Sequence, residues 1–221
     1  MEDSVDKHSR NLASQEKENM PSSKEKEITP IPIKKALPQI KRRIQDIINK
    51  YGNAVVIIEG AWATGKTTFS KAFETALKKL CRGPIILISI DEEVKNATSF
   101  LGQRPDLYKG ENLISVLSTH THSLPNNTQI LIIDGATMGD VLLNRYKIDP
   151  TNVVRINFYT DTQTQWENLY ERYRDYYDWM GKVLYTIEEY PPSINPEADF
   201  NVDNSCSHRL SPDTIQKILS E

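Results

Sequence analysis

One glycine-containing segment constrains this chain more than any other. Residues 60–67 read Gly-Ala-Trp-Ala-Thr-Gly-Lys-Thr and fit the pattern G-x-x-x-x-G-K-[S/T]. Residues 54–58, just before it, are apolar and mostly β-branched, which is typical of a buried parallel strand. Apolar residues over 69–80 recur at helical spacing. A strand, a glycine loop and a helix in this order predict a phosphate-binding loop, or P-loop.

The residues of this loop imply a particular way of holding a nucleotide. Gly60 and Gly65 let the backbone wrap closely around an anion, so that loop amides and the start of the next helix face the phosphates. Lys66 is predicted to reach the β- and γ-phosphates, and the Thr67 hydroxyl to bind Mg²⁺. We therefore expect ATP and Mg²⁺ as cofactors. The expected nucleotide-binding residues are Gly60, Ala61, Trp62, Ala63, Thr64, Gly65, Lys66, Thr67 and Thr68.

Composition limits the classes of protein that remain. The chain has 221 residues and a formal net charge of −3. It is long enough for one α/β domain, and it has no overall basic charge that would indicate a nucleic-acid partner. No run of about 18 apolar residues occurs, so we expect no membrane span. Two cysteines and a charged start without an apolar stretch favour a cytoplasmic protein, with non-classical secretion left open.

The first part of the chain differs from the rest. Residues 1–29 are rich in Glu, Lys, Ser and Asn, which predicts a disordered tail because so few apolar groups cannot offset the ordering entropy. Residues 30–38 contain three prolines and are predicted to form an extended linker. We therefore expect a charged tail and linker over residues 1–37 and a P-loop domain over residues 38–221. A protein partner for the tail is left open.

Helical and strand-like segments alternate through the rest of the chain. A helix is expected over residues 38–50, closed by Gly52, before the strand that leads into the P-loop. This alternation predicts an α/β, three-layer P-loop NTPase fold with a parallel sheet of about five strands flanked by helices. Ligands of such sheets bind at the carboxyl ends of the strands. Other strands are expected over residues 85–90, 129–134, 152–159 and 198–203, and other helices over residues 111–123, 137–146, 162–179 and 212–219.

Two acids follow predicted strands. Asp134 comes after four apolar residues, as in a Walker B motif, and is predicted to hold Mg²⁺ together with Thr67. Asp91 ends the strand after the P-loop helix, where a carboxylate would face the γ-phosphate and could accept the proton of an attacking hydroxyl. The alternative for Asp91 is a cap on the following helix.

The segment over residues 162–179 combines aromatic and basic side chains. Arg172 and Arg174 are candidates for a helical lid that stabilises charge developing on the phosphates. The alternative is a surface ion pair with Glu171 or Asp175. The aromatic side chains of this segment recur at helical spacing, which predicts packing against a core. This stripe comprises Trp166, Leu169, Tyr170, Tyr173 and Tyr177.

Together these features resemble the uridine kinase and phosphoribulokinase branch of the P-loop kinases. The resemblance implies transfer of the ATP γ-phosphate to a hydroxyl of a small molecule. It implies Lys66 and Asp91 as catalytic residues, the latter as the base, with Arg172 and Arg174 as the lid. The segments that carry it are the loop at 59–68, Ser-Ile-Asp-Glu at 89–92, Arg-Tyr-Arg-Asp at 172–175 and the closing segment at 190–204.

The chain also departs from that branch. Glu93 and Val94 stand where the family has an aromatic pair after the strand-end acid. Only about forty residues separate Asp91 from Asp134, too few for the family's usual insertion, with its nucleoside contacts, plus a helix. The Ile-Ile-Glu-Gly start of the loop is also similar to thymidylate and deoxynucleoside kinases, but their acceptor motif is missing after the third strand.

Three functions follow as hypotheses. The first is an Mg-ATP-dependent phosphotransferase acting on a hydroxyl of a small metabolite, with nucleosides as the leading acceptors and deoxynucleosides or nucleoside monophosphates as the alternative. The second is a nucleotide-binding regulator or effector without small-molecule kinase activity, which the shortened region and the charged tail suggest. The third is an ATPase or GTPase without an acceptor, although no guanine-reading Asn/Thr-Lys-x-Asp motif is present.

Overall fold

The described residues form a parallel sheet of six strands with helices packed against it. The computed structural model describes residues 28–90, 127–135, 149–189, 191–205 and 211–220. The strands pair in the order β1-β6-β5-β2-β4-β3, and every pair is parallel. The α/β fold predicted from the alternation is therefore confirmed, with one strand more than expected. The strands are β1 (Ile31–Pro32), β2 (Ala54–Gly60), β3 (Ile85–Ser89), β4 (Ile130–Asp134), β5 (Val153–Tyr159) and β6 (Phe200–Asp203).

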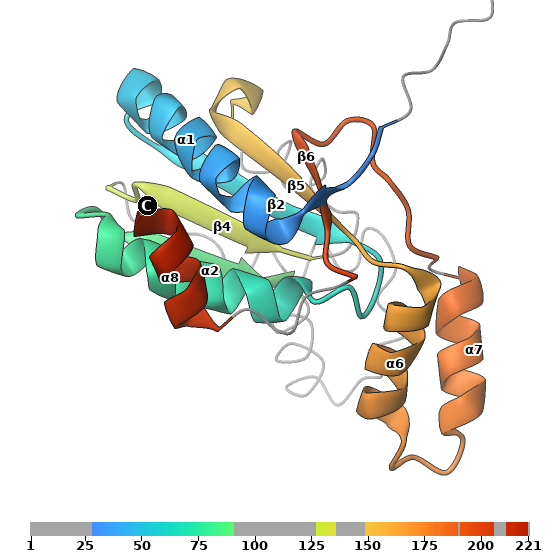
Figure 1. Cartoon of the computed structure of the whole chain (residues 1–221). Helices are drawn as coiled ribbons and strands as arrows, with labels where there is room; N and C mark the ends of the chain where they lie inside the picture. The colour runs from blue at the N-terminus through green and yellow to red at the C-terminus, as the bar shows by residue number, and fades with distance from the viewer. Residues whose placement is uncertain (1–27, 91–126, 136–148, 190, 206–210, 221) are drawn as a thin grey trace, which may run out of the picture.

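Three of the described helices cover one face of this sheet (Figure 1). They bury their apolar stripes against alternate strand residues such as Val56, Ile58 and Phe158, which are inaccessible to solvent. Burial of this kind contributes about 1.5–3 kcal/mol for each large side chain. The helices expected over residues 111–123 and 137–146 lie outside the described residues. The covering helices are α1 (Ile33–Tyr51), α2 (Lys66–Leu80) and α8 (Pro212–Ser220).

The prediction of an extended linker over residues 30–38 was wrong from Ile33 onward. Ile31–Pro32 forms an edge strand paired with β6, and α1 begins at Ile33 with Pro38 inside it. A proline inside a helix costs about 3 kcal/mol. Ile33, Ala36 and Leu37 are nevertheless buried, and they continue the apolar stripe of the following turns. Their burial offsets the local cost, so the fold begins several residues before the predicted boundary.

The single helix expected over residues 162–179 is two helices instead. The chain turns back after α6 (Thr162–Tyr173) and continues as α7 (Trp179–Glu189), and the two form a hairpin that projects from the sheet (Figure 1). The ring of Trp179 packs edge-on against Tyr170, with 5.2 Å between centroids. The aromatic stripe therefore packs mainly against a second helix rather than against the domain core, which explains the break.

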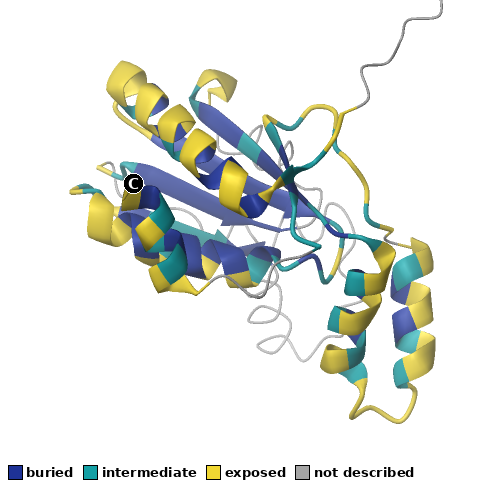
Figure 2. Cartoon of the chain, viewed as in Figure 1, coloured by how far each residue is buried: buried dark blue, intermediate teal, exposed yellow. Residues whose placement is uncertain are grey.

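Much of this hairpin faces solvent (Figure 2). Leu169 is buried, but Tyr177 is fully exposed, so the predicted core packing of Tyr177 was wrong.

Among the described residues, no helix is both long and apolar enough to cross a membrane.

Candidate nucleotide-binding site

The P-loop joins β2 to α2, as predicted, and its backbone requires small residues. Gly60 has φ +136°, and a Cβ there would lie 2.3 Å from the carbonyl oxygen of Phe158 on the neighbouring strand. Gly65 has φ +91°, and a Cβ there would lie 2.6 Å from Nδ2 of Asn204. Ala63 also adopts the left-handed region, with φ 61°. Residues with a side chain rarely adopt such backbone conformations, and backbone strain of this kind concentrates at functional sites.

The ammonium group of Lys66 is held against the start of the loop. Its Nζ donates a hydrogen bond to the carbonyl oxygen of Ala61 at 2.7 Å, and the residue is only 7% exposed. The hydroxyl of Thr64 donates to the same carbonyl at 2.9 Å. The buried cation and the carbonyl that faces it are thus fixed relative to the loop amides, as an anion-binding loop requires.

Three amide side chains hold the next three loop carbonyls. Gln165 Nε2 donates to the carbonyl of Trp62 at 3.0 Å, and Asn168 Nδ2 donates to that of Ala63 at 2.9 Å. Asn204 Nδ2 donates to the carbonyl of Thr64 at 2.8 Å. These hydrogen bonds fix the backbone of the loop, and a fixed loop backbone is what binding of phosphate oxygens by its amides requires.

Sequence reasoning missed these three amide residues. Gln165 and Asn168 lie on α6, and Asn204 follows β6, so they lie about 100–140 residues beyond the loop in the sequence. The two amides on α6 are three residues apart, which places them on one face of the helix. That spacing is the one signal that could have singled them out.

Ser70 connects the Asp134 carboxylate to the backbone of Thr67, the other predicted magnesium residue. The Ser70 hydroxyl lies 3.1 Å from Oδ2 of Asp134 and 3.1 Å from the carbonyl oxygen of Thr67. Asp134 is 1% exposed at the end of β4, beside the start of α2. Magnesium is usually held by one or two protein ligands with phosphate oxygens and waters, so the Thr67 hydroxyl and the Asp134 carboxylate fit it. The ion, when bound, would neutralise charge on the phosphates.

An aspartate caps the helix that supports the loop. The side chain of Asp161 accepts a hydrogen bond from the backbone amide of Thr164 at 2.6 Å, at the start of α6. This bond, together with bonds from the hydroxyls of Thr164 and Ser205, lowers the pKa of Asp161 below its ordinary value. The ionised cap thus fixes the helix that carries Gln165 and Asn168.

The predicted lid arginines lie on the surface. Arg172 and Arg174 are exposed, and Nη1 of Arg174 lies 3.3 Å from Oε2 of Glu171. This is the ion pair that the sequence offered as the alternative, and its contribution to stability is small. A lid role stays a prediction for both residues. Asp91 lies outside the described residues, so its role as catalytic base also stays a prediction.

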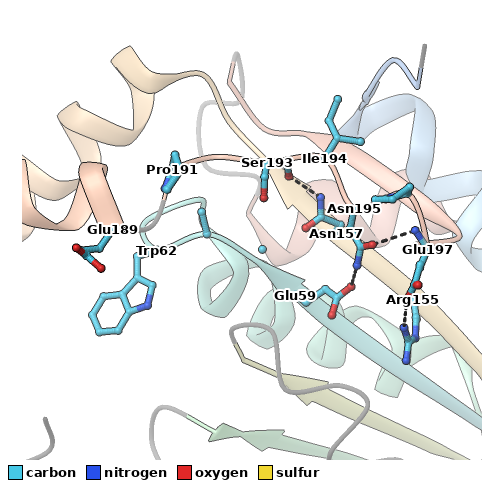
Figure 3. A pocket seen from close by; sticks show the side chains of 13 residues that line it. Glu59, Trp62, Arg155, Asn157, Glu189, Pro191, Ser193, Ile194, Asn195 and Glu197 are labelled. Atoms are coloured by element: carbon cyan, nitrogen blue, oxygen red, sulfur yellow. Dashed lines mark hydrogen bonds and ion pairs between the residues drawn. The ribbon is translucent and has the colours of Figure 1, made fainter. Parts of the chain in front are cut away.

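A cavity of about 480 Å³ opens beside the first residues of the loop. In Figure 3, Trp62 and Glu189 lie on one side of it, while Glu59, Asn157 and Asn195 lie on the other. Cavities of this volume accommodate small ligands.

The sequence itself matches no protein-family model and no curated protein. Comparison with solved structures finds several that are similar to it. A putative kinase from Chloroflexus aurantiacus is 18% identical, with a TM-score of 0.53 over 76% of this chain and 97% of that one. A gluconokinase from Sinorhizobium meliloti is 11% identical, with a TM-score of 0.49 over 76% and 91% of the two chains.

A shikimate kinase from Acinetobacter baumannii is 16% identical, with a TM-score of 0.43 over 76% of this chain and 92% of that chain. The fold assignment depends on the putative kinase from Chloroflexus aurantiacus, together with the geometry of the P-loop. The chain therefore has a P-loop kinase fold.

Proposed function

We propose that this protein is an Mg-ATP-dependent phosphotransferase that acts on a hydroxyl of a small metabolite. The observation that carries the proposal is the P-loop itself. Its carbonyls are held by side chains, the Lys66 ammonium is buried against Ala61, and the buried Asp134 lies beside the start of α2. Catalysis of phosphoryl transfer is mainly positioning and charge stabilisation, which this arrangement can provide.

Each predicted site residue has a role in the proposed reaction. The acceptor oxygen forms a bond to the γ-phosphorus, and the bond from that phosphorus to the β–γ bridging oxygen breaks. ADP departs with the bonding electrons, and the hydroxyl proton passes to a base, for which Asp91 is the candidate. Lys66 and the loop amides hold the phosphates, and Thr67 and Asp134 would hold Mg²⁺.

The finer proposal, that the acceptor is a nucleoside, depends on the resemblance to uridine kinases. The kinase fold supports a phosphotransferase without indicating its acceptor. Deoxynucleosides and nucleoside monophosphates are therefore tested beside nucleosides.

The test is release of ADP from Mg-ATP in the presence of nucleosides, nucleotides and sugar-like alcohols. We expect release that depends on one class of acceptor in the wild type and that is lost in Lys66→Ala. Asp91→Asn should keep ATP affinity and lose turnover by a factor of about 10²–10⁴. A panel without any acceptor-dependent release, with ATP still bound by the wild type, would overturn the proposal and favour a nucleotide-binding regulator.

A further inference from the structure

The hairpin formed by α6 and α7 carries a concentration of exposed apolar side chains (Figure 2). Of the eleven large hydrophobic side chains that are exposed among the described residues, six lie on this hairpin or in its turn. Single exposed apolar side chains are normal, whereas a cluster of them marks an interaction surface. The six are Trp166, Tyr176, Tyr177, Met180, Leu184 and Tyr185.

Part of this cluster follows a helical stripe on α7. Met180, Leu184 and Ile187 are spaced by four and three residues, and Tyr177 precedes Met180 by three. Met180 and Leu184 are 58% and 51% exposed, Tyr177 is fully exposed, and Ile187 is half-buried. Alternating spacings of three and four residues are those of a coiled-coil seam. We call these four residues, from Tyr177 to Ile187, the outer stripe.

The outer stripe is distinct from the face by which α7 packs on α6. The ring of Trp179 contacts those of Trp166 and Tyr170, with 6.4 and 5.2 Å between centroids. Val183, four residues after Trp179, is completely buried. Leu184 follows Val183 by one residue, which is about 100° around the helix. Packing within the hairpin therefore leaves a second apolar face of α7 exposed.

The outer stripe also faces away from the P-loop. Glu189 lines the cavity beside the loop, and it follows Leu184 by five residues, which is about 140° around the helix. On α6, Gln165 and Asn168 already bond the loop carbonyls. Closure of the hairpin over a nucleotide would therefore leave the outer stripe in water, so the stripe is suited to a different partner.

A second copy of this chain fits the outer stripe because the stripe is complementary to itself. When two α7 helices pair antiparallel about a two-fold axis near Lys182, Met180 of each copy lies opposite Leu184 of the other. In the same arrangement Tyr177 lies opposite Ile187. Large apolar side chains thus meet along the whole stripe. Antiparallel packing through such a seam is the packing found in helix bundles.

The charges of the hairpin favour this orientation over a parallel one. Residues 171–182, around the turn, contain three acidic and three basic side chains, whereas the end of α7 adds only Glu188 and Glu189. Antiparallel pairing therefore brings the acidic end of each α7 to a neutral part of the other copy, and it opposes the two helix dipoles. Parallel pairing would bring four carboxylates together, and these would repel each other.

The area of the outer stripe fits a weak dimer. At roughly 200 Å² for a fully exposed large side chain, Tyr177, Met180 and Leu184 together expose on the order of 400 Å². Two copies would bury twice this apolar area, or about 1,200 Å² in total, since about 65% of a homodimer interface is apolar. That total is at the lower end for specific interfaces.

We propose that this protein forms a weak, two-fold symmetric dimer through the outer stripe of α7, with the two helices antiparallel. This dimer goes beyond the phosphotransferase activity proposed above and does not rest on it. The described lining of the cavity beside the P-loop contains no residue of the outer stripe, so each copy keeps its own site.

The test is the molar mass of the full chain, measured by sedimentation equilibrium from about 1 to 500 µM. One copy has a mass of 25.3 kDa. We expect the mean mass to rise toward twice this value with a Kd of about 10–100 µM. The mass of one copy at every concentration would overturn the proposal. A mass that rises beyond two copies would also overturn it, because a two-fold contact closes at the dimer.

A matched pair of variants locates the interface. Leu184→Lys places a charge in the outer stripe, whereas Tyr185→Lys places the same charge at the next residue, which is 56% exposed on another face of α7. We expect Leu184→Lys to weaken dimerisation at least tenfold and Tyr185→Lys to leave its Kd within about twofold. A Kd that Leu184→Lys leaves unchanged, or that both variants weaken equally, would overturn the assignment to the outer stripe.

Both substituted positions are more than half exposed, so both variants should fold like the wild type. Circular dichroism and the urea midpoint check this. If Leu184→Lys does not fold, Met180→Lys places the charge at another exposed residue of the outer stripe, with the same expected result and the same control.

Cysteine cross-linking tests the antiparallel orientation. The native cysteines are first replaced by Cys81→Ser and Cys206→Ser. Chains with Met180→Cys mixed with chains with Leu184→Cys should then form disulfide-linked dimers on oxidation faster than either variant alone, because the two positions face each other across the axis. Faster cross-linking of each variant with itself would indicate parallel helices and overturn the proposed arrangement.

Discussion

One face of the sheet at β5 and its neighbouring strands is apolar, and the other carries a row of polar side chains. On one face, Phe158 and Ile156 pack in the apolar core beneath α1 and α2. On the other, Asn157 lies between Glu59 and Asn201 in a buried polar row. Successive side chains of one strand point to opposite faces of the sheet. Neighbouring residues of the strand therefore alternate between packing in the core and lining the polar face.

This contrast shows how a small domain fixes a polar site. The apolar face holds the strands in register, and the register then aligns polar residues that are far apart in the sequence. The alignment of the polar residues therefore depends on the core. The effects of substitutions on the two faces should therefore differ both in size and in the property that changes, which is stability or ligand binding.

The largest effect is expected on the apolar face. Phe158 is completely buried, and its ring centroid lies 4.8 Å from that of Phe69. Phe158→Ala should lower the free energy of unfolding by about 3–5 kcal/mol, because it removes a large side chain from the core and leaves a cavity. Urea denaturation of the variant and the wild type measures this. A loss below about 1 kcal/mol would contradict the assignment of this face to the core.

On the polar face the loss should be smaller. Asn157→Ala removes two hydrogen bonds, those to the carbonyl of Ser193 and to Oδ1 of Asn201. We expect a loss of about 1–3 kcal/mol in unfolding free energy. Asn201→Ala should then cost less in the Asn157→Ala background than in the wild type, since the two residues share one network. If the two losses of unfolding free energy are fully additive in the denaturation series, the two asparagines act independently and the shared network is contradicted.

A smaller effect is expected at the loop, and it should appear in ligand binding. Asn168→Ala removes the hydrogen bond to the carbonyl of Ala63. A net loss of about 1 kcal/mol corresponds to ATP affinity about fivefold weaker, because the loop must then be ordered by the nucleotide. Calorimetry with Mg-ATP measures it. Gln163→Ala is the control: this exposed amide on the same helix donates a hydrogen bond to Glu167, and the variant should bind ATP like the wild type.

The smallest effect is a pH dependence at the cap of α6. The pKa of Asp161 is lowered in the folded protein, so its charge stabilises the fold above the ordinary carboxyl pKa of about 4, and this contribution disappears as the pH falls through the lower folded value. Asp161→Asn keeps a capping side chain without the charge. Its deficit in unfolding free energy should be about 0.5 kcal/mol at pH 7 and should shrink toward about pH 3. A deficit that grows on acidification would contradict this sign.

The sequence predicted some parts of the molecule and not others for identifiable reasons. The apolar runs that became β2 and β4 were strong signals, since fully buried strands need no partner information to be recognised. Pro38 was misread because a local preference was outweighed by burial of the side chains around it. The turn between α6 and α7 was missed because nothing within the segment shows that Trp179 packs back onto Tyr170.

The sequence by itself determined the P-loop, because its chemistry lies in eight consecutive residues whose glycines and lysine act through local backbone geometry. Only the tertiary structure decided what surrounds it. The amides of Gln165, Asn168 and Asn204 reach the loop from distant segments, and the polar row beneath the cavity exists only once three strands are in register. Contacts between residues far apart in sequence depend on packing, which no local pattern encodes.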